Sequence, residues 1–160
     1  MSERRGIQLS LPLWSDHKNV ICGEELPRKG SNQMIRGIEH IGLCAADPVA
    51  LAEWYCSKLG FGVVHAIEDR KTFFVRAQNG GMLEIYPAKT TTQPVDNLHT
   101  GLRHIAVAVT DVHLEISLLR AKGIEIPDAL IVTTPEMTIA FFRDPEGNLL
   151  HLVERRKELP

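Results

Sequence analysis

The chain has 160 residues, of which 44% are hydrophobic and 24% are charged, a composition that predicts one compact domain or two half-modules sharing a core. Its 18 Lys and Arg against 20 Asp and Glu leave no basic excess to hold a phosphate backbone, so we expect a small-molecule partner and no nucleic acid. No apolar run approaches the roughly 20 residues of a membrane helix, and three cysteines without CxxC spacing favour a reducing cytoplasm over a disulfide framework.

The first 35 residues precede the first predicted strand and form an N-terminal extension of unknown role. This stretch lacks the continuous apolar core of a signal peptide, so we do not expect it to direct export. The domain itself is predicted at residues 36–155.

The first half of this domain, at about 36–88, predicts one strand, one helix and three further strands. A strand that contains His40 leads to Asp47, a suitable helix N-cap, and Gly60 is suited to end the helix that follows. The predicted ranges are a strand at 38–44, a helix at 48–59 and strands at 62–68, 72–77 and 82–86.

The second half, at about 101–155, repeats this order at nearly constant spacing. His104, Asp111 and Gly123 follow their counterparts in the first half by 64, 64 and 63 residues. The predicted ranges are a strand at 102–109, a helix at 112–122 and strands at 124–133, 138–143 and 149–154. Residues 89–100, rich in Thr, Pro and Asn, are the predicted linker.

These elements predict an α+β fold of two tandem βαβββ modules, which together form a concave, barrel-like mixed β-sheet with the helices on the outside. Side chains alternate between the two faces of a strand. The face with the continuous aliphatic residues is expected to pack on the helices, which leaves the histidine face, with its small Gly42, Ala106 and Ala108, open to a ligand.

Four polar side chains are predicted to converge on this open face. Strand alternation places His40 and Glu84 there in the first module, and His104 and His151 in the second. Burying three imidazoles and a carboxylate together is costly unless each has a partner, and a divalent cation supplies one. Three nitrogens and one oxygen suit zinc, nickel, cobalt or iron(II) better than calcium or magnesium.

Five short segments point to a known family: GIEHI at 37–41, YCSKLGF at 55–61, LEI at 83–85, RHIA at 103–106 and FRDPEGN at 142–148. Through these segments the sequence resembles the vicinal oxygen chelate superfamily, and specifically its glyoxalase I-like members. This superfamily includes glyoxalase I, methylmalonyl-CoA epimerase, extradiol dioxygenases and proteins of fosfomycin or bleomycin resistance. The usual ligands of the glyoxalase-like pattern are His or Gln, Glu, His and Glu, so His151 departs from it by replacing the second carboxylate.

The resemblance implies a metal-dependent lyase or isomerase that acts on a small oxygenated substrate through an enediolate, with Glu84 as the catalytic base. It also implies a homodimer. One alternative is an iron(II) extradiol-type dioxygenase, because two histidines and a carboxylate form its usual facial set. Another is a protein that binds a drug or metabolite without catalysis, as bleomycin-resistance members do.

Overall fold

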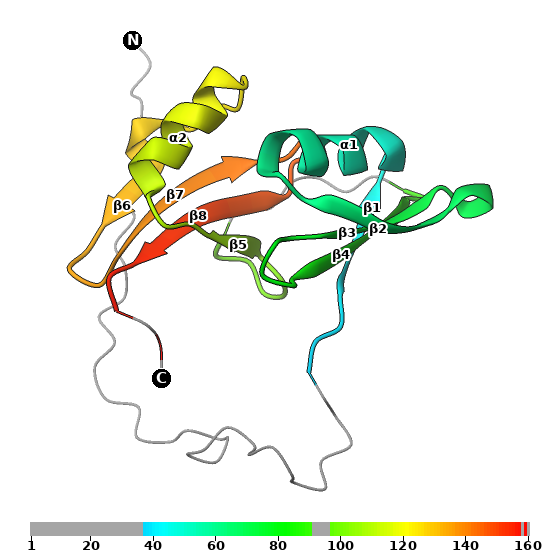
Figure 1. Ribbon diagram of the computed structural model, residues 1–160, viewed down its shortest axis with the longest axis horizontal. Helices are drawn as coiled ribbons and strands as arrows, with labels where there is room; N and C mark the ends of the chain where they lie inside the picture. The colour runs from blue at the N-terminus through cyan, green and yellow to red at the C-terminus, as the bar shows by residue number, and fades with distance from the viewer. Residues whose placement is uncertain (1–36, 91–96, 158, 160) are drawn as a thin grey trace, which may run out of the picture. The chain divides into compact units, whose positions relative to one another are not determined.

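The computed structural model describes residues 37–90, 97–157 and 159 (Figure 1). The predicted N-terminal extension and the middle of the predicted linker lie outside the described residues. All described helices and strands belong to one compact unit, Ile38–Pro160. The described strands form two separate four-stranded mixed sheets rather than one closed barrel, and the prediction of two repeated α+β modules is confirmed.

The first module has the strand order β1-β4-β3-β2, with α1 over one face of the sheet (Figure 1). The neighbours β1 and β4 are parallel, whereas β3 is antiparallel to both β4 and β2. The edge strand β2 carries a register shift between Val63 and His65. The elements are β1 (Ile41–Ala45), α1 (Pro48–Leu59), β2 (Gly62–Ile67), η1 (Glu68–Arg70), β3 (Thr72–Arg76) and β4 (Met82–Pro87).

The second module repeats this topology as β5-β8-β7-β6, with α2 packed on β7 and β8. Here β5 and β8 are the parallel pair, and β7 is antiparallel to β8 and β6. The elements are β5 (His104–Ala108), α2 (Val112–Ala121), η2 (Asp128–Leu130), β6 (Ile131–Thr133), β7 (Met137–Arg143) and β8 (Leu149–Arg155). No helix in the described part of the chain has the length and apolarity needed to cross a bilayer.

The two helices begin as the sequence predicts. Asp47 Oδ1 accepts a hydrogen bond from Ala50 N at 3.1 Å, and Asp111 Oδ1 accepts one from Leu114 N at 2.9 Å. Each bond satisfies one of the free amides at a helix start. Gly60 follows α1 with φ at 71°, a left-handed conformation that glycine adopts without steric cost.

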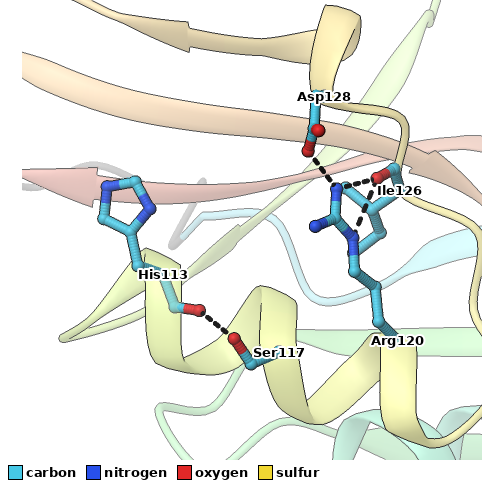
Figure 2. A network of polar contacts seen from close by, with 5 residues as sticks. All are labelled: His113, Ser117, Arg120, Ile126 and Asp128. Atoms are coloured by element: carbon cyan, nitrogen blue, oxygen red, sulfur yellow. Dashed lines mark hydrogen bonds and ion pairs between the residues drawn. The ribbon is translucent and has the colours of Figure 1, made fainter.

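The predicted strand at 124–133 is wrong over most of its length. Only Ile131–Thr133 forms a strand, because Pro127 lacks an amide hydrogen for a sheet. The Arg120 guanidinium instead binds the Ile126 carbonyl and, at 2.6 Å, the Asp128 carboxylate (Figure 2). These contacts fold the segment back against α2, where Ile126 is buried in the core.

The core lies between each helix and its sheet, on the predicted aliphatic face. Leu43 and Ala45 of β1 are buried, and Ile105 and Val107 of β5 pack against the same cluster. Leu118 of α2 does not join this core, since 46% of it is exposed. It lies two positions after the buried Ile116, which turns it toward solvent on a helix of 3.6 residues per turn.

Direct hydrogen bonds join the two modules. Lys58 Nζ donates to Lys122 O at 2.6 Å, and Lys122 Nζ donates to Lys58 O at 2.8 Å, so the C-terminal ends of α1 and α2 exchange equivalent contacts. Glu146 Oε1 accepts from the amides of Ala46 and Asp47 just before α1. Hydrogen bonds from both backbone and side-chain groups thus hold the two modules together at several points.

Candidate metal centre

The first candidate pair is held by the parallel strands β1 and β4. Glu84 is level with Gly42 in this register, and His40 immediately precedes β1 on the open face. His40 Nε2 lies 3.3 Å from Glu84 Oε2, and the two side chains are 36% and 28% exposed. An imidazole nitrogen and a carboxylate oxygen are therefore adjacent and accessible.

The second pair occupies the equivalent place in the other module. His104 begins β5, and His151 of β8 is level with Ala106. The two imidazole rings have centroids 4.6 Å apart and planes inclined at 33°. Two nitrogen donors thus lie side by side.

The structure brings the four predicted ligands together as two pairs. Within residues 37–90, 97–157 and 159, no group of three or more His, Cys, Asp or Glu side chains is placed to hold a metal ion. That all four residues bind one metal therefore stays a prediction.

His40 has a second acidic neighbour. Its Nδ1 contacts Glu39 Oε2, while its Nε2 faces Glu84. The hydrogen bond to Glu39 is the main cause that raises the pKa of His40, and the negative charges of Glu39 and Glu84 act in the same direction against a smaller effect of burial. Sequence reasoning missed Glu39, because strand alternation would place it on the opposite face from His40.

His104 is also held through Nδ1. The Oδ1 of Asn97 lies 3.0 Å from that nitrogen, on the loop before β5. Comparison of the repeats could not reveal this residue, since the acceptors come from different places in the two modules.

His151 provides a test of whether a cation fits. The side chain is buried, and its Nδ1 has no hydrogen-bond partner among the described residues. Burial, followed by the positive charges of His104 and Arg155, lowers the pKa of His151 to about 4. The ring is therefore neutral at pH 7 and has a lone pair available, so a metal ion would satisfy a buried nitrogen that otherwise carries a desolvation cost.

A phenylalanine stands beside each pair. Phe74 of β3 is level with Glu84 and contacts His40 edge to face at 5.7 Å. Phe141 of β7 is level with His151, with ring centroids 5.0 Å apart. Phe141 follows Phe74 by 67 residues, the same separation as that between Glu84 and His151, and this repeat spacing is a signal that could have identified both rings.

Tyr86 lies over Gly42 on the same open face as Glu84. A Cβ at position 42 would come 3.2 Å from Tyr86 Cε1, so the glycine leaves room for the ring. Contact with the Cys44 thiol is the main cause that raises the pKa of Tyr86, and the Glu84 charge adds to it. The phenol keeps its proton at neutral pH and can donate a hydrogen bond beside Glu84.

A cavity of about 520 Å³ is lined by residues of both modules. Its lining includes Ile41 and Leu83 of the first module and Ile105 and Ala106 of the second, and none of the four candidate ligands.

Residues 37–152 match the model of the Glyoxalase/Bleomycin resistance protein/Dioxygenase superfamily. The chain belongs to this superfamily. The match spans both modules and all four predicted ligands, and the resemblance seen in the sequence is confirmed.

Three known proteins are similar to about three quarters of this chain. YwkD of Bacillus subtilis (strain 168) is 27% identical over 130 residues, covering 76% of this chain and 99% of YwkD. The glyoxalase family protein from Enterococcus faecalis has a solved structure with a TM-score of 0.62 and 26% identity, covering 76% of this chain and all of that one. Lactoylglutathione lyase from Agrobacterium tumefaciens, at 19% identity, shares the fold with a TM-score of 0.58 over 76% of this chain and 96% of its own.

Proposed function

We propose that the protein is a divalent-metal-dependent lyase or isomerase of the glyoxalase type, whose metal site joins His40 and Glu84 of one chain to His104 and His151 of a second copy. The observation that carries this proposal is the division of the ligands into two pairs, together with the unpartnered buried Nδ1 of His151. Each pair supplies two donors, which is half of a tetrahedral shell and a third of an octahedral one.

Two exposed aliphatic side chains support assembly with a second copy. Ile38 and Leu102 each lie two residues before a candidate histidine, 64 residues apart, and are 87% and 66% exposed. A second chain that approaches both ligand pairs would bury these side chains, and each Å² of apolar surface removed from water would stabilise the contact by about 25 cal/mol. The same contact would therefore complete the site and stabilise the dimer.

The residues of the first pair suit proton transfer. A bound divalent cation would supply Lewis-acid polarisation of a substrate carbonyl. Glu84 would accept the proton from the carbon next to that carbonyl and return it to a neighbouring position, and Tyr86 would donate a hydrogen bond from the same face. Phe74 and Phe141 would cover the apolar part of the substrate and exclude water.

Metal content tests the site directly. Purified protein should contain about one zinc, nickel, cobalt or iron per chain by elemental analysis, and His104→Ala and His151→Ala should lose most of it. His113→Ala, which removes an exposed histidine of α2, is the matched control. If the wild type binds no metal at micromolar supply, the proposal fails and a drug- or metabolite-binding role takes its place.

Subunit complementation tests how the site is assembled. One variant carries His40→Ala and Glu84→Ala, the other His104→Ala and His151→Ala, and neither should bind metal alone. A mixed dimer regains one intact site if the pairs come from different chains, and none if they come from the same chain. Co-expression with two affinity tags isolates that dimer for metal analysis.

The reaction class is tested by proton exchange. The metal-loaded protein should exchange the α-protons of hydroxyketones into deuterated water, and Glu84→Gln should slow this exchange by about 10² to 10⁴-fold. Oxygen uptake with catechols, in place of proton exchange, would identify an iron(II) dioxygenase instead.

A further inference from the structure

The candidate histidines His40 and His104 share an arrangement that the repeat alone does not explain. In both, Nδ1 faces the side-chain oxygen of a residue outside the predicted ligand set, Glu39 in one module and Asn97 in the other. A carboxylate or carbonyl oxygen can only accept, so in the neutral ring the proton resides on Nδ1 and the lone pair on Nε2. For His40, Nε2 is the nitrogen that faces Glu84, at 3.3 Å.

The two acceptors have unrelated origins in the chain. The repeat counterpart of Glu39 is Arg103, whose guanidinium has no acceptor atom and instead donates from Nε to Gly101 O at 3.3 Å. Asn97 reaches His104 from seven residues upstream. The same contact is therefore built by an adjacent acid in one module and by a loop amide in the other.

We propose that Glu39 and Asn97 are positioning residues that hold His40 and His104 in the Nδ1–H tautomer and aim Nε2 at the metal. The inference rests on the metal site proposed above. An outer acceptor fixes both the tautomer and the orientation of a ligating imidazole and raises its basicity, and its loss weakens metal affinity by about 10- to 100-fold.

Four variants test this inference. Glu39→Ala and Asn97→Ala remove the acceptor, whereas Glu39→Gln and Asn97→Asp retain an oxygen that can accept. Metal dissociation constants, measured by competition with a chromophoric chelator, should rise about 10- to 100-fold in the alanine variants and far less in the conservative ones. Glu53→Ala on the exposed side of α1 and Asn79→Ala in the β3–β4 turn are matched controls.

A second readout needs no metal. Two-bond ¹H–¹⁵N correlations of the metal-free protein above pH 7 should report the Nδ1–H tautomer at His40 and His104, and a mixture at the affected ring in each alanine variant. The Nε2–H tautomer in the wild type, or unchanged metal affinity in both alanine variants, overturns the positioning role while leaving the metal site intact. A wild type that binds no metal overturns the proposed function and this inference together.

Discussion

Asp144 is a buried carboxylate in the turn between β7 and β8. Its Oδ1 accepts from the amides of Glu146 and Asn148, and its Oδ2 accepts from Tyr55 of the other module and from the Asn148 side chain. Burial is the main cause that raises the pKa of Asp144, and these hydrogen bonds oppose it. The carboxylate thus organises its own turn and also joins the modules.

Asp144→Asn is expected to lower the free energy of unfolding by about 1–3 kcal/mol, because Oδ2 is replaced by an NH₂ group that faces two donors.

The effect of this substitution is also expected to depend on pH. The raised pKa of Asp144 means that the folded state binds more protons than the unfolded state between the unfolded and the folded pKa. The stability that Asp144 contributes therefore falls as pH rises through its folded pKa. Urea unfolding of both proteins from pH 4 to 7 should show the wild-type advantage shrinking. An advantage that grows with pH would contradict this assignment.

Among the elements, α1 and α2 are joined by their C-terminal ends. The last carbonyls of a helix have no partner within it, and here a lysine from each helix end bonds a carbonyl at the end of the other. The positive ammonium groups also suit the negative end of the helix dipole. One contact therefore serves both capping and module docking.

Lys58→Met and Lys122→Met retain the apolar stem but remove these bonds. Each should cost about 0.5–1 kcal/mol in the free energy of unfolding, since exposed charged contacts contribute little. The double variant should cost less than the sum, because the first loss already loosens both helix ends. Urea denaturation of the wild type, the two single variants and the double variant measures this double-mutant cycle, with Lys89→Met as control. Strictly additive losses of the free energy of unfolding would show that the two bonds act independently.

For the helices and strands, much of the fold could be predicted from the sequence. Helix caps at Asp47 and Asp111, the closing Gly60 and the aliphatic strand faces depend on local pattern. The segment around Ile126 could not, because a distant guanidinium decides its path. For the site, the alternation of side chains along a strand was enough to predict that Glu84 and His151 lie on the open faces. Glu39 precedes the first regular strand and Asn97 lies in a loop, so the two-residue period of a strand could not predict their contacts with the histidines.

For the whole molecule, assembly is the central question. We expect the protein to be a dimer, and Ile38→Glu and Leu102→Glu should convert it to monomers and weaken metal binding together, since a charge would be buried against an apolar contact. Light scattering after size exclusion gives the mass. Leu114→Glu, at a 57% exposed position of α2, is the control. A wild-type monomer that holds a full complement of metal would contradict this assembly.

The register shift in β2 has a consequence for the protein at high concentration. This edge strand exposes Val63 and Val64 by 53% and 47%, and a regular apolar edge of this kind could template the addition of further strands into aggregates. A bulge bends the strand and interrupts the spacing of its free amides and carbonyls. The bulge therefore disfavours the edge-to-edge addition of one chain after another. A dimer, which is a closed assembly, does not require such addition.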